Sequence, residues 1–255
     1  MSAITGSGTV YLVGAGPGAA DLLTLRAARL LGEADIVFHD ALVPKEVLSL
    51  ASAAKLVPVG KRSGRRSTAQ HFINKQLLDA ARRHRTVVRL KGGDPMLFGR
   101  AHEEIEFLQR QSIAVEIVPG VTAALAASAA LRISLTKRGT ARSVTFVTPR
   151  VAEGERPSSW IDAVMAADTA AIYMGAGEAQ AISAALRAAG KAASTPVAVA
   201  ANVSLPGGRI LFGTLDRLGE LAEALAGEPA LILLGEVYAE PSALHLPARK
   251  ASQAA

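Results

Sequence analysis

The sequence predicts an α/β protein built from two α/β domains. Two observations carry this prediction. Short runs rich in β-branched residues alternate with segments whose apolar residues recur at helical spacing. Alternation of strands and helices, which continues along the 255 residues, is typical of a mainly parallel sheet covered by helices. Half of the residues are apolar and one fifth are charged, as expected of a globular protein with a substantial core.

Four strands are predicted in the first half of the chain, each bounded by Gly, Pro or charged residues: Thr9–Val13, Asp35–Phe38, Thr86–Leu90 and Val115–Val118. Two helices are predicted between them. The first follows the apolar spacing of Leu23, Ala27, Leu30 and Leu31. The second carries Ile73, Leu77 and Ala80, and we expect Ser67 to open it in a capping box with Gln70.

A second set of elements begins near Ser143. We expect strands in SVTFVT, TAAIYM, PVAVAA, RILFG and ALILLG, and helices in SSWIDAVMAA, EAQAISAALRAAG and DRLGELAEALAG. Two polar stretches, Leu135–Arg142 and Pro149–Ser159, flank the start of this second set, so we place the domain boundary near residue 141. The expected domains are 1–141 and 142–245. The tail 246–255 has nothing to pack against and is expected to be disordered.

Composition excludes several classes of function. The chain has no cysteine, which removes disulfides and thiolate chemistry. Its start lacks the features of a signal peptide, and the longest weakly charged run, Ile117–Leu131, is shorter than a membrane span. We therefore expect a cytoplasmic protein. Lys and Arg exceed Asp and Glu by 28 − 22 = 6, but aromatics make up only 4%, which disfavours nucleic acid as a partner.

Glycine clusters follow four of the predicted strands: GAGPG at 14–18, KGGDP at 91–95, PGVTAAL at 119–125 and YMGAG at 173–177. Ligands of open α/β sheets bind at the carboxyl ends of strands, so these loops predict a lined pocket. The first loop is a poor dinucleotide fingerprint, because Pro17 has no N–H for a pyrophosphate and only Asp40 could serve as the ribose-binding acid. The scattered histidines predict no metal site, although His39 stands at a strand end beside Asp40.

Six motifs occur in the order of one known family: VYLVGAGPGAADLLTLRAARLLGEADIVFHDALV, VGKRSG, VRLKGGDPMLFGR, EIVPGVTAA, LTKRG and IYMG. On these motifs the sequence resembles the tetrapyrrole methylases, and among them the members that methylate uroporphyrinogen III. The resemblance extends from Thr9 to about Glu236. It departs from their pattern at His39, at His102 and in the stretch VSLPGGR after Asn202.

The resemblance implies the tetrapyrrole methylase fold, with the cofactor cleft between its two domains, and a homodimer. It implies S-adenosylmethionine as the cofactor and S-adenosylhomocysteine as its product. The implied reaction is the double C-methylation of uroporphyrinogen III to precorrin-2, which leads to siroheme, cobalamin or heme d1. No stretch matches the dehydrogenase and ferrochelatase module of the fused siroheme synthases, so we expect the single-function form.

Carried over position by position, the resemblance assigns cofactor binding to residues of the glycine loops and of two later segments: Pro17, Gly92, Gly93, Asp94, Leu97, Thr122, Ala123, Met174, Val203 and Ala230. It assigns a proton acceptor to Asp40 and a proton donor to Lys61. Arg100, Glu103 and Arg138 match residues on the substrate side.

The residue chemistry fits these assignments while leaving alternatives open. Uroporphyrinogen carries eight carboxylates, which Arg100 and Arg138 suit as bidentate partners. Glu103 either orients Arg100, three residues away on one helix face, or binds a pyrrole N–H. Asp40 is either a base or a loop acid that caps a helix. The basic residues of GKRSGRRS (Arg62, Arg65 and Arg66) are either substrate ligands or a solvated loop.

Rival functions remain at this point. A later precorrin methyltransferase has the same fold, and assaying both substrates separates the two activities. A ribosomal RNA or diphthine methyltransferase needs a macromolecular groove, which the low aromatic content disfavours. A non-catalytic cofactor-binding regulator would show no turnover.

Overall fold

A computed structural model of the chain describes residues 7–59, 66–151 and 158–239. By their contacts, these residues form two compact units. The first contains the described residues up to Ala127 together with Asn202–Gly208, and the second contains those of Ser128–Ala201 and from Arg209 onward. The division falls within a helix, 123–131, so the boundary that we expected near residue 141 lies inside the second unit.

The first unit is built on a five-stranded sheet in the order β3-β2-β4-β1-β5, in which every pair is parallel. The strands are β1 (Thr9–Gly14), β2 (Ile36–His39), β3 (Lys55–Pro58), β4 (Thr86–Lys91) and β5 (Ala114–Val118). The sequence predicted four of them. It did not reveal β3, because KLVP is short, mostly exposed and ends in proline, as an edge strand permits.

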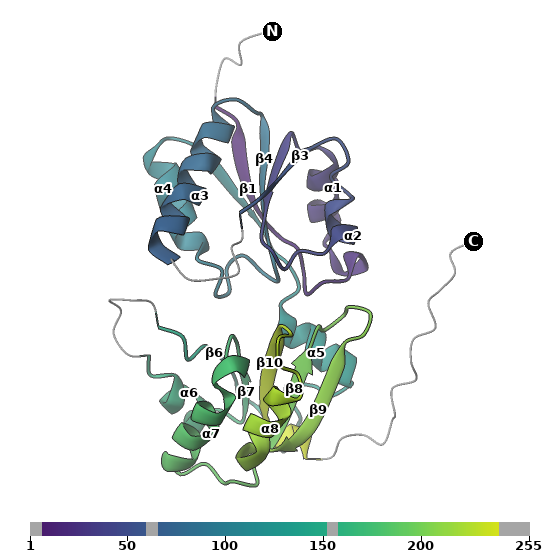
Figure 1. Cartoon of the computed structure of the whole chain (residues 1–255), viewed down its shortest axis with the longest axis vertical. Coiled ribbons are helices and arrows are strands. Elements are labelled where there is room, and N and C mark those ends of the chain that lie inside the picture. The colour runs from purple at the N-terminus through teal and green to yellow at the C-terminus, as the bar shows by residue number, and fades with distance from the viewer. Residues whose placement is uncertain (1–6, 60–65, 152–157, 240–255) are drawn as a thin grey trace, which may run out of the picture. The chain divides into compact units, whose positions relative to one another are not determined.

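Helices cover both faces of this sheet (Figure 1). α1 (Leu25–Gly32) and α2 (Lys45–Leu48) pack on one face, and α3 (Arg66–Ala81) and α4 (Ala101–Arg110) pack on the other. The Thr24 hydroxyl caps α1 by accepting a hydrogen bond from the Ala27 N–H at 3.1 Å. In α3, Ile73, Leu77 and Ala80 are buried as predicted. The helix already includes Arg66, so Ser67 lies within its first turn and is not its N-cap.

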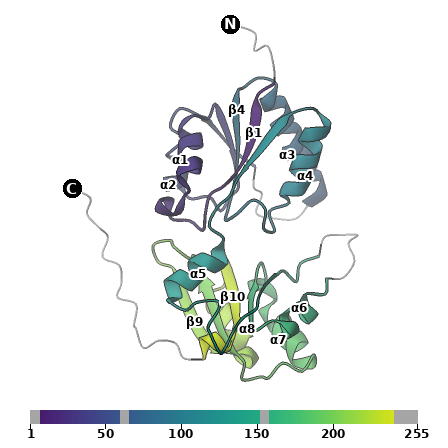
Figure 2. The same cartoon turned by 180° about the vertical axis from the view of Figure 1, so that it is seen from behind.

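Because all five strands run the same way, their carboxyl ends share one edge of the sheet, which Figure 2 shows from behind. The chain leaves that edge through the glycine loops at 14–18 and 91–95 and at Gly120. α5 (Ala123–Leu131) follows the last of them. A 3-10 turn, Ala20–Leu22, follows the first.

The second unit is built on a mixed sheet in the order β6-β7-β10-β8-β9. Its strands are β6 (Val144–Val147), β7 (Thr169–Ile172), β8 (Pro196–Ala201), β9 (Arg209–Thr214) and β10 (Ala230–Gly235). Only β6 and β7 are parallel; the other pairs are antiparallel. The link between β8 and β9 is too short for a crossover helix, so these two strands pair as antiparallel neighbours.

α6 (Trp160–Ala166), α7 (Ala179–Ala188) and α8 (Leu218–Glu223) pack on one face of this sheet. Short 3-10 turns occupy Ala176–Glu178, Leu215–Arg217 and Glu236–Tyr238. Among the residues that the structure describes, no helix is both long and apolar enough to cross a membrane.

Candidate functional site

The glycine loops of the first unit meet backbone to backbone. β4, β1 and β5 are neighbours in the sheet, so the loops that leave them lie side by side. The Ala15 N–H donates to the Lys91 carbonyl at 2.7 Å, and Gly16 and Gly93 exchange N–H···O bonds of 3.2 and 2.7 Å. The first two loops are thereby joined beyond the ends of their strands.

Close packing explains why glycine is required here. A Cβ on Gly14 would lie 2.6 Å from the backbone N of Gly120, and a Cβ on Gly120 would collide with the Gly93 carbonyl. Gly93 itself has φ of 67°, which favours glycine. Gly92 meets neither restriction: its Cβ would contact only the Leu42 Cβ, at 4.0 Å, and its φ is not positive. The space above Gly92 is therefore open, and its backbone is accessible to a ligand.

Asp94 ties the second loop to the third. One carboxylate oxygen accepts from the Gly120 N–H at 2.9 Å, and the other accepts from the Met96 N–H at 2.8 Å. The predicted cofactor residue Asp94 thus fixes the backbone of two loops. Of the other predicted residues in these loops, Thr122 is buried, while Pro17, Leu97 and Ala123 are half-buried.

A segment from far along the chain completes this part of the first unit. The Ala19 N–H donates to the Ser204 hydroxyl at 3.0 Å, across 185 residues of sequence. Leu205 fills the space where Gly18 has no side chain, because a Cβ there would lie 2.7 Å from the Leu205 Cγ. Val203 is buried within this segment. The stretch VSLPGGR, in which the sequence departs from the family pattern, therefore contacts the first glycine loop.

Strained backbone concentrates at the predicted site residues. Seven non-glycine residues among those described have positive φ: Phe98, Arg100, Ser112, Arg132, Met174, Asn202 and Ser204. Ser112 and Arg132 follow the ends of helices, where this conformation is common. The other five are predicted site residues or direct neighbours of Leu97 and Val203. Such strain costs about 1–3 kcal/mol per residue and clusters at functional sites.

Arg100 and Glu103 form the pair predicted from their spacing. The Arg100 Nε lies 2.6 Å from Glu103 Oε1, and Nη2 lies 2.7 Å from Oε2, so the contact is bidentate. Arg100 precedes the first turn of α4 with φ of 55°. Both side chains are nearly half exposed, at 42% and 47%. The guanidinium is thus oriented by Glu103 and still open to solvent.

Asp40 belongs to an ion cluster that the sequence did not reveal. Arg89 Nη2 donates to Asp40 Oδ1 at 2.5 Å, and Arg89 Nε donates to Glu104 Oε1 at 3.1 Å. Lys91 Nζ donates to Glu104 Oε2 at 2.9 Å. The signal lies in alternation along β4, where Val87, Arg89 and Lys91 share one face. Two basic residues two apart at the end of a buried strand require acidic partners.

Burial and charge oppose each other in this cluster. Burial by itself would lower the pKa of Arg89, but the carboxylates of Asp40 and Glu104 outweigh it and raise that pKa. Burial also lowers the pKa of Lys91, and the neighbouring Arg89 guanidinium lowers it further. For Lys91 the attraction of Glu104 only partly offsets these two effects. The net effect therefore differs in sign: the pKa of Arg89 is raised and that of Lys91 is lowered.

The remaining predicted residues lie in the second unit or outside the described residues. Met174 follows β7 and is exposed, with φ of 57°. Ala230 begins β10, whose register places it opposite Ala201 at the end of β8. Arg138 is exposed in the turn that the Lys137–Ala141 bridge closes. Lys61 falls outside the described residues, as do Arg62 and Arg65.

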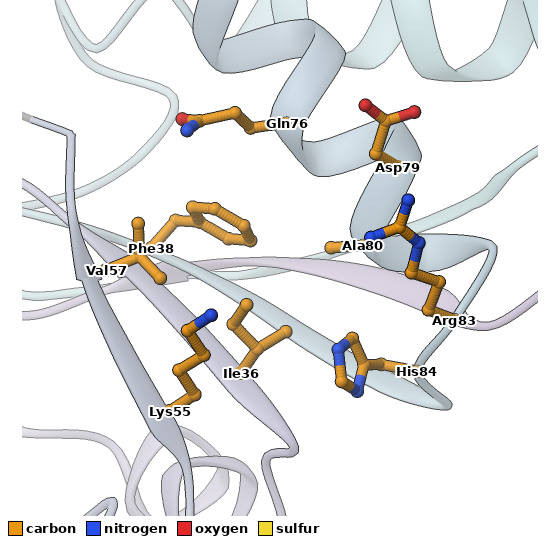
Figure 3. Close-up of a pocket in the computed structure, with 9 residues that line it drawn as sticks. All are labelled: Ile36, Phe38, Lys55, Val57, Gln76, Asp79, Ala80, Arg83 and His84. Carbon is orange, nitrogen blue, oxygen red and sulfur yellow. The ribbon is translucent and has the colours of Figure 1, made fainter.

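A shallow pocket of about 240 Å³ lies elsewhere in the first unit. Figure 3 shows its lining: Ile36, Phe38, Lys55, Val57, Gln76, Asp79, Ala80, Arg83 and His84. Ile36 and Lys55 begin their strands, and His84 follows α3, so the pocket opens toward the amino ends of β2 and β3. None of the predicted site residues lines it. We therefore place the candidate site at the glycine loops, on chemical grounds.

The chain is an α/β protein with two units, one on a parallel sheet with joined glycine loops and one on a mixed sheet. Residues 9–219 match the family model of the Tetrapyrrole (Corrin/Porphyrin) Methylases, and the chain belongs to this family. This confirms the resemblance and the fold class predicted from the sequence.

Particular relatives refine the comparison. The chain is 46% identical over 232 residues to a uroporphyrinogen-III C-methyltransferase of Pseudomonas aeruginosa, covering 91% of this chain and 94% of that protein. It is also 46% identical over 232 residues to siroheme synthase 1 of Klebsiella pneumoniae, covering 91% of this chain and 49% of that one. The chain thus spans about half the length of the siroheme synthases it matches.

Solved structures are similar as well. A uroporphyrin-III C-methyl transferase from Thermus thermophilus, complexed with S-adenyl homocysteine, superposes with a TM-score of 0.79 at 40% identity, covering 90% of this chain and 93% of that one. A cobalt precorrin-4 methyltransferase superposes with the same TM-score of 0.79 at 27% identity, covering 90% and 95%.

Proposed function

We propose that the chain is an S-adenosylmethionine-dependent methyltransferase that methylates uroporphyrinogen III twice, giving precorrin-2. The observation that carries the proposal is the set of joined glycine loops at the carboxyl ends of β1, β4 and β5, with the backbone of Gly92 left open. The relatives with that named activity support it, since one of them is matched over 94% of its length.

The residues present fit the cofactor. A Cβ on Gly14 or Gly120 would collide with the neighbouring loops, and Gly93 has positive φ, whereas Gly92 has open space around it and no positive φ. Backbone N–H and C=O groups there suit the hydroxyl and amino groups of an adenosyl ligand. Gly92, Gly93, Thr122 and Ala123 would hold the cofactor from the first unit, with Pro17, Leu97 and Val203 beside them. Asp94 would shape this backbone, and Met174 and Ala230 would contribute from the second unit.

The bound cofactor supplies an activated methyl group, so the protein mainly has to align its ligands and move a proton. A pyrrole carbon of the reduced macrocycle attacks, and a proton leaves the ring. Asp40 is the carboxylate proposed to accept it, and Lys61 is the proposed donor. The Asp40 side chain is 33% exposed, so a substrate could reach it.

Arginines would bind the substrate's carboxylates. Arg100 is oriented through two hydrogen bonds to Glu103, and its side chain is 42% exposed. A planar guanidinium binds a carboxylate bidentately, which fixes orientation as well as charge. Arg138 is proposed for the same task from the second unit. We further propose that the protein acts in the cytoplasm as a homodimer, without a nucleic-acid or membrane partner.

A turnover assay tests this function. The chain is incubated under reducing conditions with S-adenosylmethionine and either uroporphyrinogen III or a cobalt-precorrin-4 substrate, and the products are analysed by mass spectrometry. We expect two methyl transfers to uroporphyrinogen III and none to the cobalt-precorrin. Turnover of only the second substrate would assign the chain to the later methylations, as its likeness to a cobalt precorrin-4 methyltransferase allows. Cofactor binding without turnover of either would contradict the proposal.

A further inference from the structure

The buried ion cluster around Arg89 carries an inference that rests on the proposed function. We propose that Arg89 is a positioning residue, which fixes the Asp40 carboxylate toward the substrate macrocycle and is itself held in place by Glu104 and Lys91.

Only one of the four side chains of the cluster is substantially exposed to solvent. The side chains of Arg89 and Lys91 are each 4% exposed, and that of Glu104 is fully buried. Asp40, at 33%, is the one member of these four that solvent reaches substantially. The cluster holds two cations and two carboxylates, so its charges balance. Its only contact with a ligand at this edge would therefore be made through Asp40.

The geometry requires an arginine at this position. Arg89 donates in three directions: through Nη2 to Asp40, through Nε to Glu104 at 3.1 Å, and through Nη1 to the Leu90 carbonyl at 3.2 Å. The planar guanidinium makes these bonds simultaneously from fixed positions. A lysine ammonium is a single point of charge and cannot reach both carboxylates with the same geometry. Two of the three bonds anchor Arg89, and the third holds Asp40.

Glu104 and its neighbours make the anchor rigid. Gln70 Nε2 donates to Glu104 Oε1 at 3.1 Å and to Asn74 Oδ1 at 3.0 Å. The Lys91 stem passes under Gly99, whose Cβ would lie 3.2 Å from Lys91 Cε. The cluster thereby ties the end of β4 to α3, to α4 and to the loop that precedes Arg100. β4 thus contacts Asp40 through Arg89, and through Lys91 it contacts the segment next to the Arg100–Glu103 pair.

Stability alone is a weak explanation for this cluster. A buried ion pair costs desolvation that its attraction only partly repays, and well-packed apolar residues often stabilise a core as much or more. The same face of β4 is apolar at Val87 and becomes charged only toward the carboxyl edge, where the candidate site lies. The charges therefore stand where orientation of Asp40 matters and not throughout the core.

A double-mutant cycle tests the proposal. Wild type, Arg89→Lys, Asp40→Asn and the double variant are compared for kcat, for the KM of uroporphyrinogen III and for S-adenosylhomocysteine affinity. Arg89→Lys keeps the charge balance, so we expect a folded protein with cofactor affinity within about two-fold of wild type. Because a misplacement of about 1 Å can cost on the order of 100-fold in rate, we expect kcat to fall by about 10- to 100-fold. KM should change less than kcat.

The decisive readout is the effect of Arg89→Lys in the Asp40→Asn background. If Arg89 acts through Asp40, adding Arg89→Lys to the Asp40→Asn variant lowers its kcat by less than about two-fold. Multiplicative losses would mean that Arg89 acts independently, and they would overturn the proposal. So would wild-type kcat in either single variant. Arg26→Lys, in an exposed pair with Glu116, is the matched control and should retain full activity. An inactive wild type would instead overturn the proposed function, and this inference with it.

Discussion

Gly92→Ala separates ligand binding from folding. A Cβ at Gly92 would meet no protein atom closer than the Leu42 Cβ, at 4.0 Å, and the residue does not have positive φ. The added methyl group therefore causes no clash in the protein. It also restricts the unfolded chain, so we expect the free energy of unfolding to stay unchanged or rise by up to about 1 kcal/mol.

The same methyl group occupies the space that we assign to the cofactor. Forcing a methyl group against well-packed atoms costs about 1–3 kcal/mol. At about 1.4 kcal/mol per decade, this corresponds to a loss of roughly 5- to 140-fold in cofactor affinity. Titration calorimetry with S-adenosylhomocysteine measures the affinity, and urea unfolding measures the stability.

A matched control comes from the same unit. Gly32, at the end of α1, also has open space around a Cβ and no positive φ, but it does not lie in a glycine loop. Gly32→Ala should leave cofactor affinity at the wild-type value. If Gly92→Ala binds S-adenosylhomocysteine as tightly as wild type, the space above Gly92 is not the cofactor site and the reasoning is refuted.

Three further predictions follow from the site and the second unit. Asp94→Ala removes both acceptors that hold the Gly120 and Met96 N–H groups. It should lower the free energy of unfolding by about 1–3 kcal/mol in urea melts and weaken cofactor binding. Unchanged values of both would contradict the role of Asp94 in holding the two loops together. Arg100→Ala should weaken substrate binding about 30-fold or more while cofactor affinity stays constant, with little recovery in Arg100→Lys; lost cofactor binding in a calorimetric titration would contradict this. The Arg142 N–H, followed by the Ser143 hydroxyl and N–H, lowers the pKa of Asp168, so its stabilisation is present at neutral pH and lost as pH falls below about 4. Asp168→Ala should therefore melt lower than wild type at pH 7 and lose less stability on acidification, as thermal melts at pH 7 and pH 3 would measure.

The sequence revealed the parts of the site that depend on local chemistry. Glycine after a buried strand marks a close approach of backbones, and the structure joins these loops at Gly16 and Gly93. The i,i+3 spacing of Arg100 and Glu103 predicted their pairing on one helix face. The pair forms, but Arg100 precedes α4 in a left-handed conformation and only Glu103 lies on the helix.

Contacts between distant segments escaped prediction. The alternation of Val87, Arg89 and Lys91 places two cations on one face of β4, which we did not predict. Their partners are Asp40, which follows β2, and Glu104 on α4. The docking of Ser204 on Ala19 joins residues 185 positions apart, and no local pattern specifies it. Pairing of this kind depends on strand order, which the sequence did not specify.

The most direct test of the account is a crystal structure of the chain grown with S-adenosylhomocysteine. The account predicts that the ligand lies at the carboxyl edge of the first sheet, in contact with the backbone of Gly92 and Gly93 and with Thr122. A ligand bound instead in the pocket between β3 and α3, or one that leaves Gly92 open to solvent, would contradict it.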